Sequence, residues 1–105
     1  MNQDQAAFDL ITMQAAAAQA CALLKVLANP DRLLLMCQLS QGEVNVSELE
    51  MRLGIRQPTL SQQLGVLRES GLVSTRRDGK SIFYSIASQE AIAVMAVLYE
   101  QFCAR

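Results

Sequence analysis

The 105-residue sequence contains no histidine, and its three cysteines include no Cys-x-x-Cys pair. Without histidine there is no imidazole ligand for zinc, cobalt or nickel and no histidine base, and without Cys-x-x-Cys the thiol-oxidoreductase motif is missing. The chain also lacks a βαβ pattern around its cysteines, an internal repeat and a Pro-rich linker. These absences argue against an enzyme, predict no metal or cofactor, and favour a single domain.

Long apolar runs and a basic leader are also missing. No uninterrupted apolar segment reaches the ~20 residues that a membrane span requires. Asp4 and Asp9 lie where a signal peptide would be basic. We therefore expect a cytoplasmic protein with no membrane partner.

Two helices separated by a short turn are predicted in the middle of the chain. Ser47 and Glu50 have the spacing of a capping box, so a first helix should begin at Glu48 and end at Gly54. Pro58 suits the first position of a second helix, which should end near residue 70 or 71. This arrangement is a helix-turn-helix.

The second of these helices has one apolar and one polar face. At 100° per residue its leucines share one side. Hydroxyl and carboxamide groups share the other side, where they can donate to and accept from base edges, and Gly65 removes bulk where a helix must lie deep in the major groove. The residues predicted to contact DNA here are Gln57, Thr59, Ser61, Gln62, Gln63 and Arg68.

A β-hairpin is predicted directly after this helix. Asp78-Gly79 separates two β-prone runs and indicates a tight two-residue turn. Arg76, Arg77 and Lys80 cluster at the tip, where they would meet phosphates or an adjacent minor groove. A leucine pattern by itself indicates only an amphipathic helix. A basic hairpin by itself indicates only a face exposed to solvent. The ordered combination is the layout of a winged DNA-binding domain.

Charge is distributed unevenly along a chain whose net charge is −1. From Arg52 to Lys80 there are six basic and two acidic residues, a balance of +4, so the remainder carries −5. A basic face on an acidic body attracts DNA locally, with weak and salt-dependent non-specific affinity. An alternative is an adaptor that uses the winged helix to bind another protein, but the basic hairpin makes this less attractive. Binding to a partner that does not depend on salt would favour the adaptor.

The two ends of the chain are more apolar than a small monomer can hide. The sequence is 51% hydrophobic, with an Ala-rich segment from Ala6 to Ala28 and an apolar segment from Ala91 to Cys103. Helices that are apolar on more than one face belong in a bundle or a dimer interface. Between them, residues 29–31 (Asn-Pro-Asp) should open a further helix that residues 40–42 (Ser-Gln-Gly) should close.

These segments predict a mainly α fold with a β-hairpin wing, in the order α-α-α-α-β-β-α, forming a homodimer through its first and last helices. The single domain should span residues 1–105. Its parts are a helix-turn-helix at about 46–71, a wing at about 72–86, and dimerisation helices at about 5–28 and 88–104.

Three segments together resemble the ArsR/SmtB-type winged-helix repressors: residues 27–33 (LANPDRL), 57–64 (QPTLSQQL) and 71–73 (GLV). The resemblance covers nearly the whole chain. It implies a homodimer that binds an inverted-repeat operator in double-stranded DNA, blocks transcription, and dissociates when it senses an inducer. Dimer symmetry would place the two recognition helices about one DNA turn, ~34 Å, apart.

The resemblance does not extend to the metal sites of this family. Metal-sensing members carry two cysteines on the first helix of the helix-turn-helix, or His and carboxylate ligands on the last helix. Asn45 and Ser47 stand where those cysteines would fall. Cys21, Cys37 and Cys103 come from three separate predicted helices, which makes a three-thiolate site the least favoured alternative.

Cys37 and Cys103 are similar in placement to the dithiol of the BigR/SqrR-type repressors, which respond to hydrogen sulfide through persulfides. The resemblance implies that a reactive sulfur species links these thiols by a di- or polysulfide bridge and so releases DNA. Each S–S bond is about 2.05 Å, so extra sulfur atoms span a gap that a direct disulfide could close only by moving backbone. A direct disulfide formed by general oxidants is the main alternative. Cys21, which lies among alanines, is expected in the core or the dimer interface.

Overall fold

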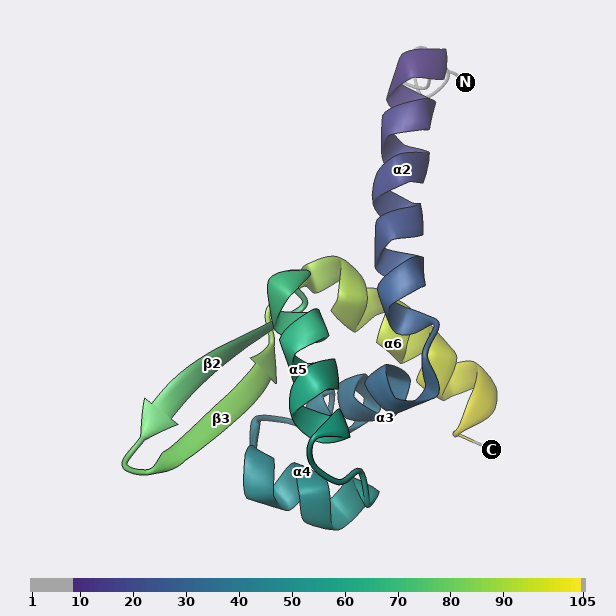
Figure 1. Cartoon of the computed structure of the whole chain (residues 1–105). Coiled ribbons are helices and arrows are strands. Elements are labelled where there is room, and N and C mark those ends of the chain that lie inside the picture. The colour runs from purple at the N-terminus through teal and green to yellow at the C-terminus, as the bar shows by residue number, and fades with distance from the viewer. Residues whose placement is uncertain (1–8, 105) are drawn as a thin grey trace.

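The computed structural model describes residues 9–104, which form five helices and three strands (Figure 1). The predicted order of helices and hairpin strands is confirmed, with one additional short strand, β1. The elements are α2 (Leu10–Leu27), α3 (Pro30–Leu39), β1 (Val44–Asn45), α4 (Val46–Leu53), α5 (Thr59–Glu69), β2 (Val73–Asp78), β3 (Ser81–Ile86) and α6 (Gln89–Phe102).

Side-chain caps define the start of α2, α3 and α6. Asp9 accepts a hydrogen bond from the backbone N–H of Thr12 and begins α2. Asn29 caps α3 in the same way, with Pro30 at the first helical position as predicted. Ser88 caps α6. The first helix was predicted from about residue 5, and its predicted residues before Asp9, Phe8 among them, lie outside the described residues.

Helix α4 begins two residues earlier than predicted. Asn45 is its cap, because the Asn45 side-chain oxygen accepts the backbone N–H of Glu48 at 2.8 Å. Pairing of β1 with β3 holds Asn45 in the extended conformation that a cap requires. The Ser47 capping box is therefore wrong. The predicted end at Gly54 is confirmed, since Gly54 has the left-handed φ of 70° that glycine adopts without strain.

Helix α5 begins at Thr59, with Pro58 at the capping position rather than at the first helical position. Proline has no side-chain acceptor, so the first turn is capped from one residue further back. The Gln57 side-chain oxygen accepts the backbone N–H of Ser61 at 3.1 Å and its hydroxyl at 2.6 Å. The helix ends at Glu69, close to the predicted end.

The hairpin turn is shifted by one residue from the prediction. Asp78 still pairs with Ser81, so Gly79 and Lys80 form the two-residue loop, with Gly79 at φ 64°. A tight hairpin turn needs positive φ in its loop, and Gly79 supplies it at the first loop position. Strand β1 pairs antiparallel with β3 and gives the sheet order β1-β3-β2. Two residues are too short for a periodic signal, which is why β1 was not predicted.

The hydrophobic core lies where α3, α4, α5 and the root of the hairpin meet, closed by the last turn of α2 and one side of α6. The predicted inward leucines of α5 are buried, with exposures of 0 to 2%. The buried set is Leu27, Leu35, Met36, Leu39, Val44, Leu49, Ile55, Leu60, Leu64, Leu67, Leu72, Val73, Ala91 and Met95.

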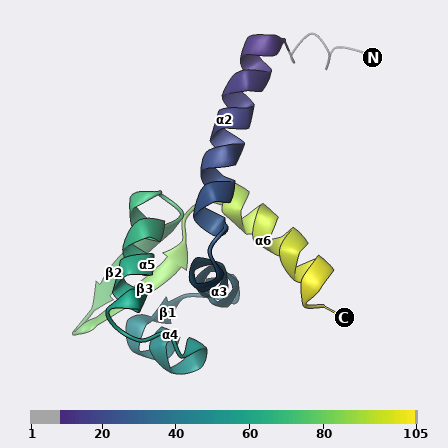
Figure 2. The same cartoon turned by 45° about the vertical axis from the view of Figure 1, so that its right-hand side comes forward.

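Helices α2 and α6 leave much apolar surface uncovered. Figure 2 shows them diverging on the side of the body away from the hairpin. Ile11 of α2 is 78% exposed and Phe102 of α6 is 75% exposed. The radius of gyration is 16.2 Å, against about 13 Å for a compact 100-residue domain. The extended shape comes from α2, which contacts the body only through its last turns.

By length and composition, α2 could also cross a membrane: it has 18 residues and a mean hydropathy of 1.5. This differs from the expectation that no segment would qualify. Gln14, Gln19 and Lys25 interrupt the apolar run, but the many alanines keep the average high. One such helix is weak evidence for a span, because apolar helices of soluble proteins pass the same test.

Candidate nucleic-acid interface and cysteine pair

Helix α5 presents the polar face that the sequence predicted. Its leucines point into the core, while Gln57, Ser61, Gln62 and Arg68 are exposed and Thr59 is half-buried. The face is therefore exposed, and its hydroxyl and carboxamide groups suit the edges of bases, although the Ser61 hydroxyl donates to Gln57 within the chain.

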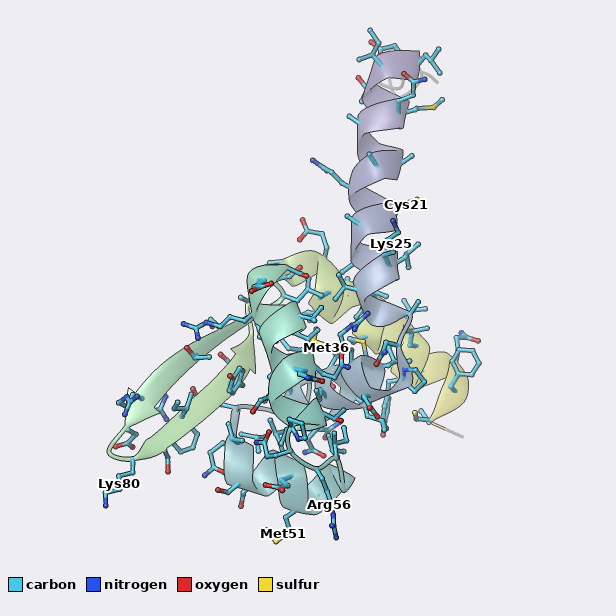
Figure 3. The ribbon with its side chains drawn as sticks, viewed as in Figure 1. Cys21, Lys25, Met36, Met51, Arg56 and Lys80 are labelled. Carbon is cyan, nitrogen blue, oxygen red and sulfur yellow. The ribbon has the colours of Figure 1, made fainter. Side chains whose placement is uncertain are left out.

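A groove of about 400 Å³ separates α5 from the hairpin. Arg68 lines it from α5, Lys80 and Ser81 from the hairpin, and Ser47 from the first turn of α4. Lys80 stands at the hairpin tip, away from the body (Figure 3). Two cations and several hydroxyl groups, those of Ser61 and Tyr84 among them, line this open groove and suit a phosphate backbone.

Arg76 differs from the other hairpin cations, because it already has partners. Its guanidinium donates two hydrogen bonds of 2.8 Å to the Glu43 carboxylate and stacks 4.5 Å from the centre of the Phe83 ring. Glu43 raises the pKa of Arg76 through these hydrogen bonds. Within residues 9–104, Arg77 and Lys80 make no such ion pair or hydrogen bond. The geometry thus favours Arg77 and Lys80 over Arg76 as phosphate ligands.

Gln63 also has an intramolecular partner. Its side-chain oxygen accepts a hydrogen bond of 2.8 Å from Arg32, and the side chain is half-buried. Of the carboxamides predicted to contact DNA from α5, Gln62 is therefore the exposed and unpartnered one within residues 9–104. Partners such as Arg32 and Glu43 were missed because they lie 31 and 33 positions away along the chain, beyond the reach of local patterns.

The two cysteines predicted to act together lie on helices that pack against each other. Cys37 is on α3, half-buried against the core, and Cys103 follows the last turn of α6 and is exposed. Burial raises the pKa of the Cys37 thiol, and the negative charge of Cys103 raises it further. The structure therefore places the two thiols within electrostatic reach of each other.

This environment does not activate Cys37. A reactive thiol needs a lowered pKa, and at Cys37 the shift is in the opposite direction. The exposed Cys103 is the more accessible of the two thiols to an incoming reagent.

Cys21 is exposed on α2, away from the body (Figure 3). Its expected place in the core of this chain is thus wrong, and the dimer interface remains as the expectation. Among residues 9–104, no group of three or more His, Cys, Asp or Glu side chains is arranged to hold a metal ion.

Removing Cys103 should lower the pKa of Cys37. In Cys103→Ser the like-charge contribution is lost, but burial remains, so the pKa of Cys37 should fall towards that of an ordinary thiol without reaching it. The pH dependence of Cys37 alkylation, followed by peptide mass spectrometry, measures this shift. Cys21→Ser is the control and should leave it unchanged. An unaltered Cys37 profile in Cys103→Ser would show that the two thiols are not coupled in solution.

Comparison with known proteins agrees with this geometry. Residues 29–75 match the family described as "Bacterial regulatory protein, arsR family". The chain is 56% identical over 95 residues to the biofilm growth-associated repressor of Agrobacterium fabrum, an alignment that covers 90% of this chain and 81% of the relative.

Solved structures show the same fold. The transcriptional repressor BigR from Xylella fastidiosa superposes with a TM-score of 0.84 at 50% identity, covering 93% of this chain and all (100%) of that one. A homodimeric winged helix-turn-helix domain from Mycobacterium bovis superposes with a TM-score of 0.73 at 31% identity, covering 85% of this chain and 82% of that one. Because the likeness in both sequence and fold extends over most of its length, the chain belongs to the ArsR family of bacterial regulatory proteins and is a winged-helix transcriptional repressor rather than an enzyme.

Proposed function

We propose that this repressor is a cytoplasmic homodimer that binds an inverted-repeat operator and leaves it when reactive sulfur species bridge Cys37 and Cys103. The observation that carries the sulfur response is the packing of α3, which holds Cys37, against α6, which Cys103 ends. Family membership and the polar face of α5 support the operator, and the exposed apolar surfaces of α2 and α6 support the dimer.

Recognition of the operator divides between two surfaces. The exposed face of α5, with Ser61 and Gln62, enters the major groove and contacts base edges. Arg68 and Lys80, which line the groove between α5 and the hairpin, hold phosphates together with the exposed Arg77 of β2. Since the remainder of the chain is acidic, binding depends on this local basic surface and weakens steeply with salt.

The dimer covers the apolar faces of the two outer helices. A second copy packed on α2 and α6 would bury side chains such as Leu24 and Val97, which are 55% and 59% exposed in the single chain. Such burial contributes roughly 25 cal/mol per Å² of apolar surface removed from water. It also accounts for the apolar composition of α2 without a membrane.

The sulfur chemistry needs only thiols and a donor. The Cys103 thiolate attacks the central sulfur of an organic trisulfide, RS–S–SR, and expels RS⁻, which leaves a mixed trisulfide in which Cys103 Sγ is bonded to the transferred sulfur atom and that atom to SR. The Cys37 thiolate then attacks the transferred sulfur atom and expels the second RS⁻, which leaves a trisulfide bridge. With a hydropersulfide, RS–SH, Cys103 takes the terminal sulfur and releases a thiol, and attack by Cys37 expels HS⁻ to leave a disulfide.

A bridge between Cys37 and Cys103 would link α3 covalently to the end of α6, and these two helices have different roles. Helix α3 packs against the recognition helix α5, whereas α6 belongs to the proposed dimer interface. A covalent link between them changes the spacing or mobility of the recognition helices without touching DNA. A general oxidant would form a direct disulfide between the same two cysteines. The additional sulfur atom in the bridge distinguishes an organic trisulfide from such an oxidant, whereas a hydropersulfide leaves the same disulfide.

The dimer is tested by sedimentation of the reduced protein. At micromolar concentration it should sediment as a dimer and unfold with a concentration-dependent midpoint. Leu24→Glu places a charge on the exposed apolar face of α2 and should shift the protein towards monomer. The matched control is Met51→Glu on α4, which is 75% exposed and lies away from α2 (Figure 3), and it should remain dimeric. A monomeric parent that still binds a full operator tightly would contradict the proposal.

A further inference from the structure

Arg32 joins three helices through hydrogen bonds. It lies in the first turn of α3, where its backbone N–H donates to the Asn29 cap at 3.0 Å. Its Nε donates to the carbonyl of Val26 in the last turn of α2 at 2.6 Å, and its Nη1 donates to the Gln63 side-chain oxygen on α5 at 2.8 Å. One side chain therefore connects the proposed dimerisation helix to the recognition helix.

The chemistry of this bridge suits arginine. The last carbonyls of a helix have no intrahelical partner and carry partial negative charge, so a cation at the Val26 carbonyl is favourable. The planar guanidinium holds its donors in a fixed fork, and Nε and Nη1 reach the two acceptors at once. Arg32 is half-buried and makes no ion pair with a carboxylate among residues 9–104, so these two uncharged oxygens are its side-chain partners.

The bridge ends beside the part of α5 that meets DNA. Gln63 is the immediate neighbour of the exposed Gln62, and it faces the body rather than solvent. A shift of α2 against α5 would break at least one of the two side-chain hydrogen bonds. The same helix α3 carries Cys37 in its second half, so a movement of α3 also moves Arg32.

We propose that Arg32 is a positioning residue for operator recognition, which holds α5 at a fixed orientation to α2 and thereby sets the separation of the two recognition helices in the dimer. This inference rests on the proposed homodimer and its inverted-repeat operator. It assigns Arg32 no contact with DNA. Its effect is on the geometry of two half-sites, not on the affinity for one.

The preference for one spacing between half-sites is the property to measure, because a residue that only stabilised the fold of each subunit would not change it. Three duplexes serve as probes: one selected in vitro by the parent protein, the same duplex with one base pair inserted at its centre, and a duplex with a single half-site. Arg32→Gln should lose roughly 2- to 30-fold in affinity for the selected duplex and tolerate the inserted base pair better than the parent. Its affinity for the single half-site should equal that of the parent.

Arg52→Gln is the matched control, because it also removes one positive charge and one hydrogen-bonded side chain, the exposed pair with Glu48 on α4. It should keep the parent's preference for the selected spacing. Arg32→Lys keeps the charge but cannot reach both acceptors, so it serves the same test if Arg32→Gln does not fold.

The parent protein tests the inverted-repeat dimer, and the Arg32 variants test the positioning role of Arg32. A parent that binds both spacings equally would overturn the inverted-repeat dimer and this inference with it. A parent that discriminates, together with an Arg32→Gln or Arg32→Lys that discriminates equally well, would overturn the inference and leave the proposed function standing. Equal losses on the half-site and the full operator would also overturn it, because they would indicate damage to the fold of each subunit.

Discussion

Cys37→Ser and Cys103→Ser are each expected to stay on the operator after treatment with an organic persulfide, whereas the parent is released. Each variant removes one end of the proposed bridge, and neither cysteine belongs to the α5 and hairpin surface that meets DNA. For induction to matter, the bridged and reduced parent proteins should differ in operator affinity by about 5- to 150-fold. Operator affinity measured before and after treatment gives this ratio, which should be close to one for both variants.

Cys21→Ser is the control for this experiment, since Cys21 is exposed on α2, away from the pair (Figure 3). It should fold, dimerise and be released as the parent is. If Cys103→Ser dissociates as readily as the parent after persulfide treatment, the two-cysteine mechanism is wrong.

Gln62→Ala is expected to weaken operator binding by about 1 to 3 kcal/mol and to have little effect on random DNA. The reason is that Gln62 is exposed on the polar face of α5 and has no intramolecular partner among residues 9–104. Titration of both DNAs at several salt concentrations separates this loss from a loss of phosphate contacts. Equal weakening on both DNAs would remove Gln62 from base recognition.

Two arginines of the hairpin provide a matched comparison for the same titration. Arg77→Ala should weaken both DNAs and reduce the salt slope by about one, because a phosphate ligand is lost. Arg76→Ala should change the slope less, because Glu43 already neutralises Arg76. Equal slopes for the two variants would show that the Glu43 pair opens on DNA.

The parts of the fold that sequence predicted are those that local chemistry determines. The Asn29-Pro30 start of α3, the left-handed Gly54 and the leucine face of α5 each depend on residues within one or two turns. The errors in the predicted helix start and hairpin turn are also local, and in each a residue one or two positions away has the predicted structural role. Asn45 rather than Ser47 caps α4, and the hairpin loop begins at Gly79 rather than Asp78.

What sequence could not supply is contact between distant segments. Gln63 and Arg76 were both predicted to contact DNA, and each also has an intramolecular partner that the sequence did not reveal: Arg32 donates to Gln63, and Glu43 accepts from Arg76. The burial that raises the pKa of Cys37 likewise depends on how α3 and α6 meet the core. These contacts join elements across more than thirty residues, and no periodicity or short motif encodes them.

Intact mass measurement with peptide mapping shows whether sulfur transfer links Cys37 to Cys103. The reduced protein is treated with an organic trisulfide and, separately, with peroxide. After the trisulfide we expect a Cys37–Cys103 linked peptide that carries one additional sulfur atom, together with loss of operator binding. A protein that loses its operator while these two cysteines remain free thiols, or are linked only to other residues, would contradict this mechanism.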